Sequence, residues 1–165
     1  MRRAATCVSI GASTPAPAMW QRRRASAHPV LLWVDDYKPG LELYRAMFEA
    51  LGFRVFTASS GEEALQIAAL HHIDVVVTDY EMPGMNGEAV AIAIRTLQPK
   101  TPIVLFSGST LIPARARKLA DAVCDKAGSR HQLSSTIHRV LLRKRSRGLQ
   151  PPPVARASES HRTVA

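Results

Sequence analysis

Five residues of the chain together suit phosphoryl chemistry, and they follow separate apolar runs. They are three aspartates, a serine and a lysine. Asp35 and Asp36 follow the first run, Asp79 the third, Ser107 the fourth and Lys126 the fifth. Three carboxylates brought close together would repel one another unless a cation lay among them. Because no histidine or thiolate ligand accompanies them, these oxygen donors favour Mg²⁺, which keeps several waters and also binds phosphate oxygens.

Asp79 is the natural nucleophile of this group. It is a single carboxylate at the tip of a β-branched run, whereas Asp35 and Asp36 are adjacent and better placed as metal ligands. An aspartate can accept a phosphoryl group covalently, and a lysine and a serine can bind the phosphoryl oxygens. The residue types therefore predict a phosphoacceptor site in which Ser107 and Lys126 assist Asp79.

The apolar runs have the composition of strands that are covered on both faces, since they are apolar without alternation. They comprise residues 30–34, 54–57, 73–78, 103–106 and the short run 122–124. Helical periodicity with local start and stop signals predicts the intervening helices. The first of these helices ends before Gly52, and the second begins after the capping box of Ser60 and Glu63. The third covers residues 88–97 and the fourth residues 115–120. The fifth begins after Ser129, which caps it together with Gln132.

Strict alternation of five strands with five helices predicts an α/β fold. Since crossovers between parallel strands are right-handed, the expected architecture is a doubly wound five-stranded parallel sheet with helices on both faces. The ligand site of such a sheet lies at the carboxyl ends of its strands. The acidic residues, the serine and the lysine all follow strands, so we expect them to meet at that edge.

Residues 29–142, the segment that contains all these elements, resemble the response-regulator receiver domain of bacterial two-component systems, whose fold is flavodoxin-like. The resemblance rests on an ordered set of motifs, namely Asp35-Asp36, Asp79-x-x-Met82-Pro83-Gly84-Met85-x-Gly87, Ser107-Gly108 and Lys126. Each motif is weak alone, but their joint order and spacing are highly specific.

The resemblance implies that Asp79 is phosphorylated by a histidine kinase or a phosphotransfer protein. It also implies that Asp36, Asp79 and the backbone carbonyl of Glu81 bind Mg²⁺ directly, while Asp35 acts partly through water. A receiver of this kind is a signalling phosphoacceptor and not an enzyme, although it takes part in its own phosphotransfer and dephosphorylation.

Three departures from the family pattern concern signal output. Ala127 follows Lys126 where the family usually has a proline, and Val123 stands where many members carry a tyrosine or phenylalanine. The stretch from Ser107 to Lys126 is short, which predicts a stunted fourth helix. These departures motivate an alternative function, that of a degenerate receiver that binds other proteins without being phosphorylated.

The net charge of +9 lies in the two ends of the chain. Residues 1–28 contain five Arg and no acid, and residues 143–165 contain six Lys or Arg and one Glu, whereas residues 29–142 hold eleven basic and twelve acidic residues. Solvated, disordered tails are favoured over nucleic-acid binding, because the tails lack aromatic residues interleaved with the basic ones. Any DNA contact is expected only through these basic tails.

The remaining features concern where and with what the protein acts. No window is apolar enough to cross a membrane, and two cysteines fit a reducing cytoplasm. The 23 residues after 142 are too few and too polar for an output domain. We therefore expect a stand-alone receiver with an unknown downstream protein partner. Whether translation begins at Met1 or Met19 stays open.

Overall fold

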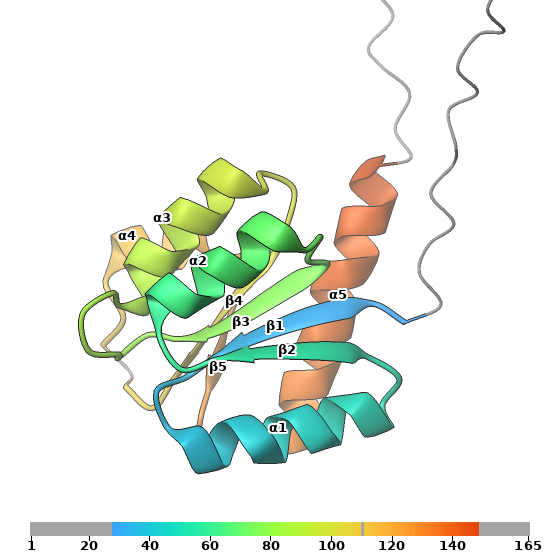
Figure 1. Ribbon diagram of the computed structural model, residues 1–165, viewed down its shortest axis with the longest axis horizontal. Coiled ribbons are helices and arrows are strands. Elements are labelled where there is room, and N and C mark those ends of the chain that lie inside the picture. The colour runs from blue at the N-terminus through green and yellow to red at the C-terminus, as the bar shows by residue number, and fades with distance from the viewer. Residues whose placement is uncertain (1–27, 110, 149–165) are drawn as a thin grey trace, which may run out of the picture.

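A five-stranded parallel sheet forms the centre of the computed structural model, which describes residues 28–109 and 111–148 (Figure 1). The strand order is β2-β1-β3-β4-β5, and every neighbouring pair is parallel. The strands are β1 (Val30–Val34), β2 (Arg54–Ala58), β3 (Val75–Asp79), β4 (Ile103–Ser107) and β5 (Ala122–Asp125). The helices are α1 (Lys38–Ala50), α2 (Gly61–Leu70), α3 (Gly87–Leu97), α4 (Ala114–Leu119) and α5 (Arg130–Gly148). The predicted doubly wound sheet is confirmed.

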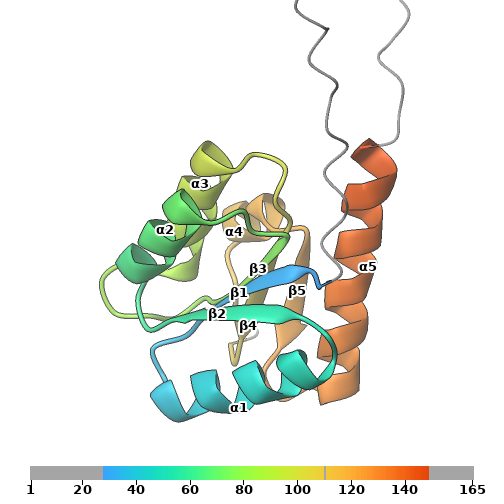
Figure 2. The ribbon, with the colours of Figure 1, turned by 45° about the vertical axis from the view of Figure 1, so that its right-hand side comes forward.

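Two helical layers cover the sheet. Helices α1 and α5 lie on one face, and α2, α3 and α4 lie on the other (Figure 2). Successive side chains of a strand point to opposite faces. In β1, Leu31 and Trp33 therefore pack with α1 and α5, while Leu32 and Val34 pack with α2 and α3. This double coverage explains why the strands read as continuous apolar runs.

The core on the α1 and α5 side is rich in aromatic rings. Trp33 stacks on Tyr44 with ring centroids 4.1 Å apart, and Phe106 meets Trp33 edge-on at 5.3 Å. Both Trp33 and Phe106 are buried, as the sequence predicts. Aromatic pairs in such geometries add about 0.5–1.5 kcal/mol beyond the burial of their area, so this cluster is a rigid support beneath the ends of β1 and β4.

Helix α5 continues six residues beyond residue 142, the limit that the sequence predicts for the folded segment. Its apolar stripe ends near Leu142, so no periodic signal marks the last turns. Lys144 nevertheless reaches back to the sheet, where its Nζ lies 3.2 Å from the backbone oxygen of Asp74 and 3.4 Å from its Oδ1. The structure thus assigns residues 143–148 to the folded domain. Of the tails predicted over 1–28 and 143–165, residues 1–27 and 149–165 lie outside the described residues.

The start of α2 shows one half of the predicted capping box. The Ser60 hydroxyl accepts a hydrogen bond from the backbone N–H of Glu63 at 3.2 Å. The Glu63 carboxylate, however, accepts from the backbone N–H and the hydroxyl of Ser59, one residue earlier than a capping box requires. The Ser60 side chain thus satisfies one N–H of the first turn, and the helix starts directly after Ser60, as predicted.

Candidate functional site: an acidic edge spanned by a lysine

The parallel register brings the predicted site residues to one edge of the sheet. Val34 pairs with Thr78, and Asp79 pairs with Phe106, so the chain leaves β1, β3 and β4 at the same level. Ser107 pairs with Asp125, which places Lys126 at this edge as well. The backbone N–H of Lys126 donates to the carbonyl of Ser107 at 2.9 Å.

Lys126 joins two buried carboxylates. Its Nζ lies 2.7 Å from Oδ2 of Asp79 and 3.0 Å from Oδ2 of Asp35. Asp35 and Asp79 are only 3% and 6% exposed, whereas 32% of the lysine side chain is accessible to solvent. A single ammonium group shared by two carboxylates leaves one unit of negative charge uncompensated.

The pKa of Lys126 reflects this arrangement. Burial alone would lower it, but hydrogen bonds and charge from Asp79 and Asp35 outweigh burial and raise the pKa above its ordinary value. The lysine is therefore a permanent cation at neutral pH, and it can pair with an anion that approaches Asp79.

Asp36 completes a cluster that can hold a divalent cation. One carboxylate oxygen from each of Asp35, Asp36 and Asp79 lies within 4.8 Å of the other two. Asp36 is exposed, so this side of the cluster faces solvent. With Lys126 counted, the four side chains carry a net charge of −2, and all the ligand atoms are carboxylate oxygens. This charge and these donors fit Mg²⁺.

Glu81 and Ser107 touch the site differently from the other residues. The backbone N–H of Glu81 donates to Oδ1 of Asp79 at 3.1 Å and so fixes the orientation of that carboxylate. Ser107 is buried at the end of β4, but its hydroxyl accepts from the N–H of Ser109 at 3.0 Å, within its own turn. Metal binding by the Glu81 carbonyl and phosphoryl binding by Ser107 stay predictions.

The loop between β3 and α3 depends on two glycines. Gly84 has a φ of +72°, a conformation that side chains with a Cβ rarely adopt. Gly87, the first residue of α3, passes so close to β3 that a Cβ atom there would lie 2.3 Å from the carbonyl oxygen of Asp79. The glycine therefore lets α3 start against the backbone of the residue that carries the central carboxylate.

Two neighbours of the site carry no signal in the sequence. Tyr44 of α1 lies near Asp35, and burial together with that negative charge raises the pKa of its phenol. Glu88, at the start of α3, pairs with Arg115 of α4 at 2.9 Å. Both contacts join residues far apart in the sequence, and only a known register of helices on the sheet would have found them.

The fold and this edge together define the receiver class of signalling domains, in which an acidic cluster beside a lysine accepts a phosphoryl group. Residues 31–137 match the model of the response regulator receiver domain, and the chain belongs to this family. It is thus a receiver domain of two-component signalling with a phosphoacceptor role, and receivers are not enzymes in the usual sense.

Several known proteins resemble the chain. The virulence sensor protein BvgS of Bordetella bronchiseptica is 44% identical over 81 residues, which cover 46% of this chain and 6% of BvgS. The cell cycle transcriptional regulator CtrA of Caulobacter vibrioides is 27% identical over 121 residues, covering 72% of this chain and 52% of CtrA. The chain thus spans about half or less of the length of these relatives.

Among solved structures, the response regulator TrrA of Thermotoga maritima in complex with Mg(2+)-BeF has a TM-score of 0.64 and 28% sequence identity. The superposition covers 68% of this chain and 98% of TrrA.

Within residues 28–109 and 111–148, no helix has the length and apolar character needed to cross a bilayer.

Proposed function

We propose that the protein is a stand-alone receiver in which Asp79 accepts a phosphoryl group in a magnesium-dependent reaction. The observation that carries the proposal is the contact of Lys126 with both Asp35 and Asp79, at 3.0 and 2.7 Å, inside a cluster of three carboxylates. A structural ion pair needs only one carboxylate. Here three clustered carboxylates share one lysine, and the remaining negative charge favours the binding of a further cation.

The phosphodonor would be a phosphohistidine of a histidine kinase or of a phosphotransfer protein. An oxygen of the Asp79 carboxylate forms a bond to phosphorus, while the bond from phosphorus to the imidazole nitrogen breaks. The electron pair of the broken bond leaves with the imidazole, which takes up a proton. Lys126 moves from the carboxylate of Asp79 to a phosphoryl oxygen, and Ser107 turns from its own loop to donate to another.

Magnesium would be held by Asp35, Asp36 and Asp79, with the carbonyl of Glu81 as a further ligand, and would neutralise charge on the phosphoryl oxygens. The fit rests on the charge and the oxygen donors of the cluster. The structure of TrrA is a complex with Mg(2+)-BeF, which supports this assignment by similarity.

The partners and the location belong to the same proposal. A receiver acts by binding another protein or by passing on its phosphoryl group, so we propose a histidine kinase or phosphotransfer protein and a downstream protein as partners. Cys124 is a free, buried thiol, which suits a reducing cytoplasm. The virulence sensor BvgS and the regulator CtrA are both longer than this chain.

Mass spectrometry after incubation with acetyl phosphate and Mg²⁺ tests the proposal. The wild type should gain one phosphoryl group, and EDTA should prevent the gain. Asp79→Asn should gain none, whereas Asp125→Asn, which changes an exposed acid beside Lys126 but outside the cluster, should react like the wild type. Labelling that persists in Asp79→Asn would refute the assignment of the acceptor.

A degenerate receiver is the second candidate, because the Ser107 hydroxyl is bonded within its own turn and Val123 offers no aromatic ring. Such a protein would bind its partner equally well with and without acetyl phosphate. Absence of any phosphoryl adduct on the folded wild type, with Mg²⁺ present, would favour this candidate.

A further inference from the structure

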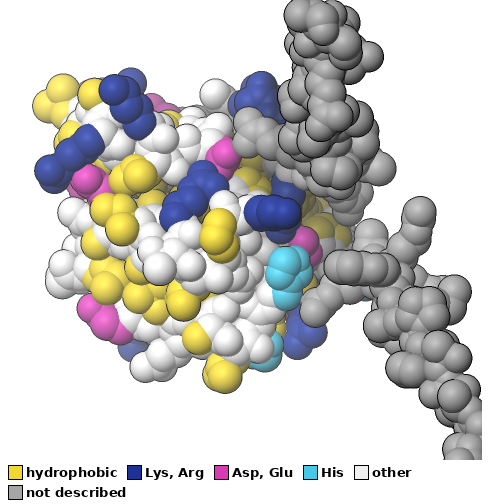
Figure 3. Space-filling model, turned by 90° about the horizontal axis from the view of Figure 1, so that it is seen from above, with side chains coloured by type: hydrophobic (Ala, Val, Ile, Leu, Met, Phe, Trp, Pro, Cys, Tyr) yellow, Lys and Arg dark blue, Asp and Glu magenta, His cyan; other side chains and the backbone are white. Residues whose placement is uncertain are grey.

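A groove lies at the opposite edge of the sheet from Asp79, near the amino ends of β3 and β4. It is lined by the end of α3 and the turn that follows, the start of β5 and the last turns of α5, and its volume is about 600 Å³. Figure 3 looks onto the molecule from above Figure 1 and shows basic side chains spread over that face with hydrophobic ones among them. No residue of the phosphoacceptor site lines this groove.

The walls of the groove are fixed by Arg95. Its guanidinium lies 2.6 Å from the carboxylate of Asp121 and also donates to the carbonyls of Thr101 and Leu119. Asp121 in turn accepts from the backbone N–H of Ile103. These bonds tie α3 to the segments before β4 and β5, so the groove exists before any ligand arrives.

The apolar part of the lining comes from Pro99, Pro102, Ala120 and Val140. Pro99 is exposed, whereas Pro102 and Val140 are buried behind it and hold the wall in place. This wall can pack against a flat or compact apolar group, and the volume lies within the range of small-molecule sites.

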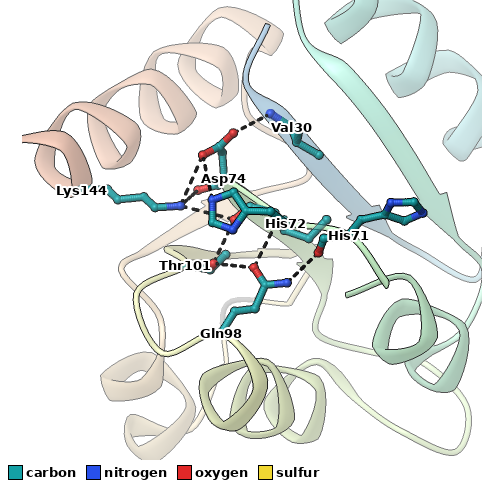
Figure 4. A network of polar contacts seen from close by, with 8 residues as sticks. Val30, His71, His72, Asp74, Gln98, Thr101 and Lys144 are labelled. Carbon is teal, nitrogen blue, oxygen red and sulfur yellow. Dashed lines mark hydrogen bonds and ion pairs between the residues drawn. The ribbon is translucent and has the colours of Figure 1, made fainter. Parts of the chain in front are cut away.

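Lys144 is the best anchored of the basic residues here. Figure 4 shows it reaching from α5 to Asp74, whose other oxygen accepts from the backbone N–H of Val30. The contact with Asp74 is long, at 3.4 Å, and burial lowers the pKa of the lysine although the nearby carboxylate opposes that change. The ammonium group also donates to the backbone carbonyls of Ile73 at 3.3 Å and Asp74 at 3.2 Å, so Lys144 is a fixed cation at the base of the groove.

Lys100 and Arg143 are exposed on the rim of the same groove. Within the described part of the chain, neither makes an ion pair or a side-chain hydrogen bond. Arg95 is matched by Asp121 and Lys144 by Asp74, so the lining carries two cations in excess. A phosphate monoester carries a charge of about −1.5 to −2 at neutral pH.

From this juxtaposition of two cations without an ion-pair partner, a fixed lysine and an apolar wall, we propose that the groove binds a phosphate monoester that carries a small apolar or aromatic group. A nucleoside monophosphate has this chemistry. The phosphate would lie between Lys100 and Arg143 above Lys144, and the base would lie against Pro99. Such binding leaves the carboxyl edge free for phosphotransfer.

The charge of the chain argues against its own tails as the occupant. Residues 1–28 contain no acid, and residues 149–165 contain two Arg and one Glu, so neither matches a basic groove.

Calorimetric titration of the full chain with AMP tests the proposal, in EDTA so that no metal holds the phosphate at the acceptor edge. We expect saturable binding to the wild type and to Asp79→Asn. Adenosine and inorganic phosphate should each bind about tenfold or more weakly than AMP, because each lacks one half of the ligand.

The double variant Lys100→Ser, Arg143→Ser should lose about tenfold or more in AMP affinity. The matched control removes two exposed cations elsewhere, Lys118→Ser with Arg130→Ser, and should stay within about twofold of the wild type. Thermal melts of both variants show whether each is folded. Equal weakening in the two double variants, or no saturable binding of AMP by the wild type, would overturn the proposal. Binding of an acidic peptide at these residues in place of AMP would overturn it in favour of a protein partner.

Discussion

Replacing Asp36 by asparagine should make the protein more stable than the wild type without metal and less stable than the wild type with Mg²⁺ bound. Asp36 lies within 4.8 Å of carboxylate oxygens of Asp35 and Asp79. Two unit charges at this separation repel by about 0.9 kcal/mol in water and about 3.5 kcal/mol at an effective dielectric constant of 20. Because Asp36 is exposed, the smaller value applies to each pair.

Lys126 offsets part of this repulsion, so Asp36→Asn should raise the free energy of unfolding in EDTA by about 1 kcal/mol. For a folded segment of this size, that corresponds to a rise in Tm of about 3–6 °C. Magnesium at a hundred times its dissociation constant should stabilise the wild type by about 2.7 kcal/mol. The variant should gain much less, so the order of stabilities reverses.

Differential scanning calorimetry in EDTA and in Mg²⁺ measures both effects. Glu42→Gln, an exposed acid of α1 outside the cluster, is the control and should change neither Tm by more than about 1 °C. Asp35→Asn should instead lower the Tm in EDTA. The Asp35 carboxylate pairs with Lys126 and accepts a hydrogen bond from the backbone N–H of Tyr37, and the substitution removes its charge. A variant at Asp36 that is no more stable in EDTA, or that gains as much from Mg²⁺ as the wild type does, would refute this reasoning.

Two further predictions concern the frame around the site. Gly87→Ala should lower the free energy of unfolding by about 2–4 kcal/mol, because its Cβ would collide with the backbone of β3. Gly108→Ala has open space around the new Cβ and should change the free energy of unfolding by less than about 0.5 kcal/mol. Urea unfolding compares the two variants, and equal effects would contradict the close approach at Gly87. A chain that ends at residue 142 should unfold at lower urea concentration than one that ends at residue 148, since only the longer chain keeps the contact of Lys144 with Asp74, at the start of β3. Coincident unfolding curves would show that the last turns of α5 stabilise nothing.

The strands were predictable because each is buried on both faces and bounded by polar residues. All five appear where the apolar runs place them, and β1 agrees at both ends. The third strand starts two residues later than its apolar run, because the side chain of Asp74 accepts from the N–H of Val30 at the edge of the sheet. Strand ends depend on such contacts with other segments, which no local pattern contains.

The candidate site was predictable as a set of residues but not as a set of contacts. Topology alone brings the ends of β1, β3, β4 and β5 to one edge, so Asp79 and Lys126 were predicted at the same edge although β4 lies between their strands. That Lys126 contacts Asp35 as well as Asp79, and that the Ser107 hydroxyl turns into its own loop, depends on side-chain rotamers. These details follow from packing, and apolar periodicity carries no information about them.

Helix α4 has only six residues, as the short stretch before Lys126 predicts, and the cap residue Pro113 offers no side-chain hydrogen bond. It packs through Ala116 into a small cluster with Leu105 and Ile112. A helix this short has little stability of its own. Its amide protons should therefore exchange through local opening at a free energy well below that of global unfolding. A partner that binds on this side would therefore contact the helix that costs least to rearrange, and binding could change its conformation at a small energetic cost.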